Sequence, residues 1–462
     1  MKINIYEDLK KMIFNTKYIG FILSLFSLAC SVTLPDNAKK NANKDNNTIL
    51  GIASILPKPS TSYVIVPNSD TTMPLISVLS HDSGLNTLKS NITLDSNVGD
   101  ITGTVNNHIY ANLTNANKVA VMNIDSNGVR FIKYINAGSR PVHIYLDPDG
   151  KIWSMNDGNS GVDNINSACN NAGVSSVTII QDGASGASDT DYASLIKHLC
   201  VGKGHHKAIF TTSPKRAFVS SITDNTVSVI DNEPLNSTYL TVLATLSLGT
   251  GAGPHGFSYS SVSGKVYISA QTAGTVIAVN PSSLAMETIS TPKSGPSTSS
   301  PNGLYIALPG KDTTSDSNHV IGKVTILNAS THVFSTVSIT DVSPDHMMFN
   351  SDGTRLYVAS AQAGSGNQVT NLNQSVLLVY DSSNLPSLNL IAQIPVGACK
   401  SGNRHINAAS HGSMMHIFNP AGDGILYTVD SMSNSVTQKI NLGGSFNNAY
   451  YHTLGAAPSH SH

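Results

Sequence analysis

Histidines recur at one position of a repeated stretch of this sequence, and imidazole is a side chain that binds metals and transfers protons. In unit after unit, a His stands ten to twelve residues ahead of an aromatic residue that anchors the unit. Neutral imidazoles brought together from separate units would form a site for a transition metal. The candidate ligands at or beside this position are His143, His206, His255, His346, His411, His416 and His452.

Further metal donors lie close to these histidines in the sequence. They are His205, His405 and two pairs of methionines, Met347 with Met348 and Met414 with Met415. Imidazole together with thioether suits copper, so copper is the first candidate cofactor, and zinc is the alternative because imidazole alone also suits it. The competing interpretation is that each His donates to a carbonyl of a neighbouring blade and ties adjacent blades together, while the methionine pairs fill the core between sheets.

Three basic residues flank the candidate ligands. Arg140, Lys207 and Arg404 could hold a small anion beside the metal, because a guanidinium offers two parallel donors. The sequence contains no G-x-S-x-G elbow, P-loop or H-E-x-x-H motif. The pattern therefore leaves open whether the protein is an enzyme.

The elements that must position these side chains are short strands, repeated about every forty to fifty residues. A typical unit is GKVYISAQTAGTVIAVNP, in which an aromatic strand, a polar turn and a Val/Ile strand follow one another. A further strand that ends in a tight turn precedes most units, as in IYLDPDG, FSYSSVSG and MMFNSDG, so each unit has four strands. The anchor aromatics are Tyr63, Tyr110, Trp153, Phe218, Tyr267, Tyr305, Tyr357 and Tyr427.

These motifs resemble the YVTN-type β-propeller repeat family. The resemblance implies an all-β propeller of four-stranded blades. Eight anchors predict eight blades, and seven would follow if the Tyr305 unit is degenerate. The final segment AYYHTLGAAPS looks like a leading strand with no unit after it, so we expect it to pair with the first unit and close the ring.

In a propeller the leading strand is innermost and lines the channel, so the recurring histidines would face one another. This arrangement is similar to the propeller of nitrous-oxide reductase, where histidines from inner strands hold a copper cluster. Two units depart from the pattern, because Asp100 and Ser297 stand where the others have His. The resemblance implies a copper site for metal handling or redox chemistry.

The beginning of the chain looks like an export signal. Basic residues precede an apolar run over 18–28, which is too short to span a bilayer. The run ends in Ser27-Leu28-Ala29-Cys30, which resembles the lipobox of bacterial lipoproteins and predicts a lipid on Cys30. We therefore expect a signal peptide over 1–29, a tether over 30–49, one propeller over 50–458 and a tail over 459–462. A lipid-anchored protein of the bacterial cell envelope, in the outer membrane or periplasm, is predicted, with secretion as the alternative.

Composition and cysteine usage agree with that compartment. The chain has 27 Lys+Arg against 28 Asp+Glu and only 12% charged residues, which argues against a nucleic-acid partner. Cys169 and Cys200 bracket a Gly/Ser/Asp-rich excursion and could form a disulfide in an oxidising space, while Cys399 is expected to be buried and inert.

Three functions remain in order of preference. The first is a lipid-anchored, monomeric propeller that binds copper, or else zinc, and the enzyme that fits it would be a copper-dependent oxidoreductase. The second is a surface scaffold that binds a protein or a glycan through the inserts over 154–203 and 370–404. The third and weakest is a lactonase-like hydrolase.

Overall fold

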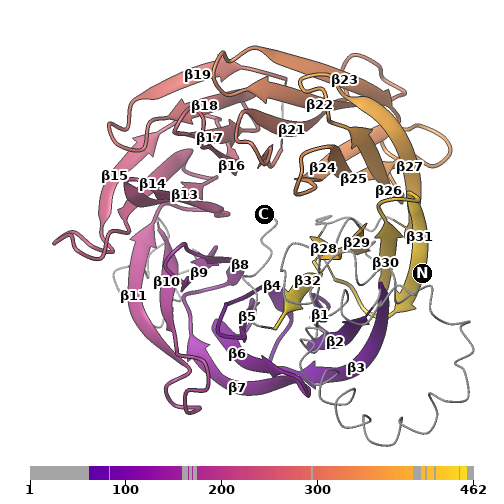
Figure 1. The fold of residues 1–462 in the computed structure, drawn as a ribbon. Helices are drawn as coiled ribbons and strands as arrows, with labels where there is room; N and C mark the ends of the chain where they lie inside the picture. Colours follow the sequence, from indigo (N-terminus) through magenta and orange to yellow (C-terminus); the bar gives the residue numbers. More distant parts are fainter. Residues whose placement is uncertain are drawn as a thin grey trace, which may run out of the picture. The chain divides into compact units, whose positions relative to one another are not determined.

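Antiparallel four-stranded sheets, arranged around a central channel, make up the computed structural model of the chain (Figure 1). It describes residues 62–82, 84–158, 165, 169, 174–292, 295–398, 407–411, 414–420, 423–446 and 448–454, of which 407–411 and 414–420 are described only in their strand course. The sheets in these ranges number eight. The predicted all-β propeller with eight four-stranded blades is thus what the structure has, and the short Tyr305 unit forms a blade of its own.

Blades 1 to 4 each contain four strands, named from the innermost to the outermost. Blade 1 contains β32 (Tyr450–Thr453), β1 (Ser62–Pro67), β2 (Leu75–Asp82) and β3 (Leu85–Thr93). Blade 2 contains β4 (Val98–Gly103), β5 (His108–Leu113), β6 (Lys118–Asp125) and β7 (Gly128–Asn136). Blade 3 contains β8 (Pro141–Leu146), β9 (Lys151–Asn156), β10 (Ser175–Asp182) and β11 (Ala193–Val201). Blade 4 contains β12 (Ala208–Thr212), β13 (Lys215–Ser221), β14 (Thr226–Asp231) and β15 (Val242–Ser247).

Blades 5 to 8 have the same strand order. Blade 5 contains β16 (Pro254–Ser260), β17 (Lys265–Ala270), β18 (Thr275–Val279) and β19 (Met286–Ser290). Blade 6 contains β20 (Thr298–Ser299), β21 (Tyr305–Asp312), β22 (Ile321–Asn328) and β23 (Phe334–Thr340). Blade 7 contains β24 (Val342–Phe349), β25 (Arg355–Gln362), β26 (Gln374–Asp381) and β27 (Asn389–Ala398). Blade 8 contains β28 (Asn407–His411), β29 (Met414–Pro420), β30 (Ile425–Asp430) and β31 (Ser435–Asn441).

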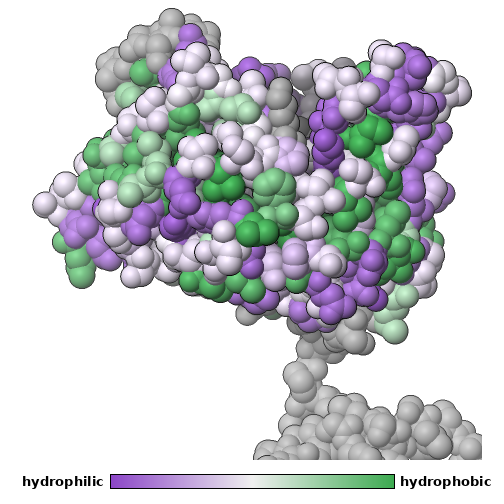
Figure 2. All heavy atoms as spheres, turned by 90° about the horizontal axis from the view of Figure 1, so that it is seen from above, coloured by the Kyte–Doolittle hydropathy of each residue, from purple (hydrophilic) through white to green (hydrophobic). Residues whose placement is uncertain are grey.

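The hydrophobic core lies between neighbouring blades. Every residue of β1, β5 and β9 is buried, so these second strands lie at the centre of the core, although they also contain buried polar residues such as His108 and Ser154. Tyr110 of blade 2, for example, packs against Ile144 and Ile152 of blade 3. The outer strands form the wall of the ring, where β31 alternates between exposed and half-buried residues and where polar and apolar side chains mix (Figure 2).

The ring is closed by the last strand. β32 pairs antiparallel with β1, which places Thr453 opposite Ser62 and His452 opposite Tyr63. The predicted closure is therefore confirmed. It leaves no open edge between the first and the last blade, and an open edge would pair with other chains.

Blade 8 differs from the sequence-based expectation. Its anchor Tyr427 lies on the third strand β30, because an extra strand, β28, precedes the strand that the repeat pattern takes as innermost. His416 therefore lies on the second strand, opposite Ala409, and does not begin the inner strand. The prediction for His416 is wrong at the level of the strand, and its side chain is outside the described residues.

The two faces of the disc are distinct. We call the mouth face the side on which the inner strands begin and on which the second strand of each blade turns into the third, as at residues 222–225. We call the base face the opposite side, which carries the turns from inner to second strand and from third to outer strand, as at residues 213–214 and 232–241. β1 begins at the base face, because Ser62 lies opposite Thr453 at the end of β32.

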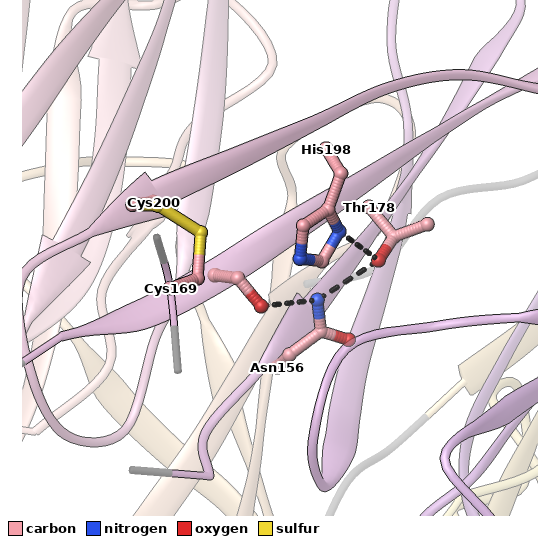
Figure 3. The surroundings of a disulfide bond; sticks show 6 residues. Asn156, Cys169, Thr178, His198 and Cys200 are labelled. Atoms are coloured by element: carbon pink, nitrogen blue, oxygen red, sulfur yellow. Dashed lines mark hydrogen bonds between the residues drawn. A yellow bond between two sulfur atoms is a disulfide. The ribbon is translucent and has the colours of Figure 1, made fainter. Parts of the chain in front are cut away.

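A disulfide joins Cys169, in the excursion between β9 and β10, to Cys200 on the outer strand β11 (Figure 3). This is the pair that the sequence suggested. Beside it, Asn156 donates to Thr178, whose hydroxyl also lies 3.0 Å from Nδ1 of His198. Cys169 is thereby held at the mouth end of blade 3.

Residues 61–462 form one compact unit. The ranges that the structure describes contain no helix long and apolar enough to cross a membrane. Cys30 and Cys399 lie outside the described residues, as do the predicted signal peptide and tether.

Candidate metal site at the channel mouth

Four inner strands begin with a β-bulge, and each bulge contains a polar residue of the predicted site. The pairing of inner and second strand shifts between Val98 and Ile101, Pro141 and Ile144, Pro254 and Gly256, and Pro344 and Met347. The residues of interest inside these shifts are Asp100, His143, His255 and His346. A bulge turns a side chain out of the regular alternation of a strand. The bulges thus explain how residues from separate blades reach the channel.

The side chains at this level contact one another around the mouth. Asn448, just before β32, donates to Asp100 Oδ1 over 3.1 Å. Asp100 Oδ2 lies 3.3 Å from Nδ1 of His143, and Nε2 of His143 lies 2.9 Å from Nε2 of His205. Residues of blades 1 to 4 therefore form one continuous polar chain.

Both imidazoles of this pair have a carboxylate on their other nitrogen. Asp157, directly after β9, lies 2.5 Å from Nδ1 of His205, as Asp100 lies beside Nδ1 of His143. We assign the proton to Nδ1 in both rings, because a carboxylate can only accept. Each Nε2 then carries a lone pair directed at the other ring. Two lone pairs at 2.9 Å repel each other, unless a proton or a metal cation lies between them.

His255 and His346 extend the cluster across the channel. The rings of His205 and His255 lie 5.1 Å apart at 31°. His255 and His346 also line a cavity of about 30 Å³ together with Lys207 and Tyr145, enough for a single ion or water. Nδ1 of His255 is buried and has no hydrogen-bond partner among the described residues. This nitrogen is therefore available to bind a metal ion in the cavity.

Burial keeps the imidazoles of His143 and His255 neutral. Burial and then the positive charge of Lys207 hold the pKa of His143 well below its usual value. The same two effects lower the pKa of His255 to about 3. Near neutral pH both rings are therefore in the form that binds metals.

Lys207 is the cation at the centre of this network. Burial lowers its pKa to about 8, although Asp100, Asp157 and Asp345 act in the opposite direction. Burial would raise the pKa of Asp157, but the hydrogen bonds from His205 and His206 outweigh it and keep that pKa below the usual value. The mouth thus holds three carboxylates, one ammonium and the neutral imidazoles of His143 and His255 in close range.

Some sequence-predicted ligands lie elsewhere. His206 uses both nitrogens within the protein, Nδ1 toward Asp157 at 3.0 Å and Nε2 toward the carbonyl of Gly202 at 2.8 Å, so its neighbour His205 takes the channel position instead. His452 lies at the base end of β32, where Nε2 is 3.2 Å from Asn107 Oδ1. These two predictions are wrong as to the ligand position.

Among the other predicted site residues whose side chains the structure describes, only Lys207 lies in the histidine cluster. Arg140 is exposed at a left-handed turn with φ 57°, whereas Lys207 is in the cluster. β28 ends with His411 at the base end of its strand. Arg404 and His405 lie outside the described residues, and so do the side chains of His411 and of the Met414–Met415 pair.

The described methionines are not in the channel. Met347 packs in the hydrophobic cluster between blades 6 and 7, and Met348 packs against the cluster between blades 7 and 8. The thioether argument for copper therefore fails for this pair. The donors that the structure brings together are imidazoles with carboxylates behind them, a set that also suits zinc.

The sequence did not predict three residues of this network as part of the site. They are Asp157, Asp345 and Asn448. His81 and His108, which lie outside the repeat position, are also buried. Within the described ranges, no group of three or more His, Cys, Asp or Glu is already arranged to hold a metal.

A larger cavity opens on the same face. It measures about 490 Å³ and is lined by residues of blades 5 to 7, among them Thr272, Lys311, Ser343 and Asp345. Asp345 also acts electrostatically on His255 and Lys207. The cavity and the histidine cluster are therefore adjacent, and together they form the candidate site.

Comparisons with known proteins identify the fold. The chain matches no family model, and the comparison with curated proteins gives no match either. AztD of Citrobacter koseri is 13% identical with a TM-score of 0.55, over 87% of this chain and 100% of that one. The dihydro-heme d1 dehydrogenase NirN in complex with DHE is 12% identical with a TM-score of 0.55, over 86% and 76%. A candidate 6-phosphogluconolactonase of Bacteroides fragilis is 14% identical with a TM-score of 0.51, over 74% and 97%. At these identities the likeness concerns the propeller fold alone.

Proposed function

We propose that this propeller binds one divalent transition-metal ion at the channel mouth and serves in metal handling. The observation that carries the proposal is the pair of Nε2 atoms of His143 and His205, 2.9 Å apart with a carboxylate behind each ring. Carboxylates behind imidazoles are the usual second shell of metal-binding histidines. His255 and His346, across the channel, would complete the ligand set.

Zinc matches the side chains at the channel mouth better than copper does, and copper(II) is the alternative ion. The imidazole and carboxylate groups suit both ions, while the described methionines that would favour copper(I) are buried in hydrophobic clusters. When bound, such an ion supplies Lewis acidity or a cargo for transfer. The protein's own residues have separate tasks: Asp100 and Asp157 fix the ring orientations, and Lys207 compensates carboxylate charge before the ion arrives.

The decisive experiment is metal analysis of protein purified without a histidine tag. We expect about one zinc or copper ion per chain in the wild type and in His452→Ala, and a loss of bound metal in His143→Ala and His205→Ala. Calorimetric titration of stripped protein with Zn²⁺ and then Cu²⁺ would identify the preferred ion. Metal well below one per chain, or metal retained in both channel variants, contradicts the proposal.

We further propose that the protein is lipid-anchored through Cys30 in the cell envelope. The Ser27-Leu28-Ala29-Cys30 motif supports this, and the Cys169–Cys200 disulfide agrees with an oxidising compartment. Mass spectrometry of the N-terminal peptide from membranes would detect the lipid. A soluble, unmodified mature chain in the medium would support secretion instead.

A hydrolase is the second candidate. The Asp157–His205 pair has the geometry of a general base held by a carboxylate, and the 490 Å³ cavity beside it could admit a substrate. A panel of lactones incubated with metal-stripped protein tests this candidate. Turnover that disappears in His205→Ala but not in His143→Ala would favour hydrolysis over metal handling.

A further inference from the structure

Exposed large hydrophobic residues gather at one face of the propeller. In the ranges that the structure describes, each of them lies in a base-face loop or in the first four residues of an outer strand, which begins at the base face. The six most exposed ones all belong to the base-face turns or their immediate edge: Leu85, Val105, Leu235, Val262, Val333 and Met432. The histidine cluster lies on the opposite face.

The apolar positions are distributed around the whole ring. The six residues just named come from blades 1, 2, 4, 5, 6 and 8, and Leu195 and Leu390 add blades 3 and 7. Single exposed apolar residues are common on proteins, so their number decides nothing. Their restriction to one side, with every blade contributing, indicates a partner that is flat and as wide as the disc. A lipid bilayer has that shape, whereas a globular protein would cover one sector.

The chain reaches the propeller at this same face. Residues 1–61 join it at Ser62, which lies at the base end of β1. Cys30 precedes Ser62 by 62 − 30 = 32 residues. If the predicted tether over 30–49 is a random coil, its root-mean-square span is about 25 Å. A lipid on Cys30 would therefore keep the base face close to the membrane surface.

The charged residues of the base face determine which lipid headgroups it can contact. Basic residues near the base face already pair with carboxylates, as in Arg130 with Asp189 and Lys215 with Asp149. These pairs leave the described part of this face poorly suited to anionic headgroups, which need a cluster of available basic side chains. A second copy of the chain fits less well, because two base faces would bring these carboxylates together.

We propose that the base face lies on a zwitterionic bilayer, with the channel mouth directed away from it into the aqueous phase. This inference rests on the lipid anchor of the proposed function but not on the metal. Its consequence is that ions and partners reach the histidine cluster from the side opposite the membrane. Contact between the exposed apolar residues and the bilayer holds the base face on the membrane. The lipid on Cys30 raises the local concentration of the propeller at the membrane surface.

Fluorescence quenching tests the orientation. The chain contains a single Trp, Trp153, which is fully buried and gives a constant background. Leu235→Trp places a reporter on the base face, and Thr313→Trp places one in the exposed loop between β21 and β22 on the mouth face. The lipidated proteins are reconstituted into vesicles of phosphatidylcholine brominated on its acyl chains. We expect the signal added at position 235 to fall at least twofold relative to unbrominated vesicles, and the signal added at 313 to stay unchanged.

Each other outcome has a definite meaning. Lipidated protein with an unquenched reporter at 235 overturns the docking and leaves the anchor intact. Protein without lipid on Cys30 overturns both. Quenching at 313 instead of 235 reverses the orientation and contradicts the proposal, as does a stable dimer that protects position 235 when no vesicles are present.

Discussion

Nε2 of His143 and Nε2 of His205 face each other at 2.9 Å, although the two residues belong to different blades. Their Nδ1 atoms are held by Asp100 and Asp157. This relationship makes the mouth of the channel a place where a cation is favoured, and the predictions about the site start from it.

Asp157→Asn should weaken metal binding without unfolding the protein. The amide can donate as well as accept, so it no longer fixes the proton of His205 on Nδ1, and the loss of such a partner costs roughly 10–100-fold in metal affinity. Competition with a chromophoric chelator measures the change. Asp352→Asn, at an exposed base-face turn, is the matched control and should bind like the wild type. Equal affinity of both variants would contradict the proposed role of Asp157.

Lys207→Met should strengthen metal binding at pH 7 by about tenfold, which corresponds to ~1.4 kcal/mol. The buried ammonium lowers the pKa of His143 and His255 and would repel a metal ion in the same way. Because the pKa of Lys207 is lowered to about 8, wild-type affinity should rise between pH 7 and pH 9, and the variant should lack that rise. Titrations in metal buffers at both pH values measure this. Weaker binding by the variant would show that Lys207 supports the site.

His452→Gln should reduce the acid sensitivity of the fold. Burial lowers the pKa of His452 from 6.5 to about 4, so as pH falls from 6.5 to 4 the unfolded chain takes up a proton that the folded chain does not. The free energy of unfolding then falls by about 1.4 kcal/mol per pH unit through this group, at most about 3 kcal/mol in all, and is unaffected above pH 6.5. Urea unfolding with EDTA at pH 7.5 and pH 4.5 measures the difference between wild type and variant.

His319→Gln is the contrasting control for that experiment. Its hydrogen bond to Asp341 raises the pKa of His319, so its contribution has the opposite sign, present at low pH and lost as pH rises through the folded-state pKa. A His452→Gln variant as acid-sensitive as the wild type would refute the assignment.

Asp182→Ala should destabilise the propeller by about 3 kcal/mol. Asp182 of blade 3 accepts from Nδ1 of His108 and from the hydroxyl of Tyr110, both at 2.6 Å, and the two donors are fully buried in blade 2. Removing the carboxylate leaves both without their partner. Asp189→Ala, which removes an exposed ion pair with Arg130, should leave thermal stability almost unchanged. Similar unfolding of the two variants would contradict the bridging role.

Sequence alone determined the repeating architecture. Turn residues, period-two strands and the aromatic anchors predicted four-stranded blades, and the unpaired final strand predicted the closure through β32. It also located His143, His255 and His346 near the starts of inner strands, and the two cysteines of the disulfide. Strands and turns are local, so patterns a few residues long are sufficient to specify them, whereas the closure and the disulfide join distant segments and were inferred from an unpaired final strand and from the cysteines that bracket an excursion.

The tertiary structure decided which side chains meet. Neighbours in a strand point to opposite sides, so the choice between His205 and His206 depends on the exact backbone course, and β-bulges displace Asp100, His143, His255 and His346 from the regular alternation. The extra strand β28 moved His416 to a second strand. The carboxylates of Asp100 and Asp157 became part of the site only through contacts between blades, because such contacts depend on ring geometry that no short stretch of sequence encodes.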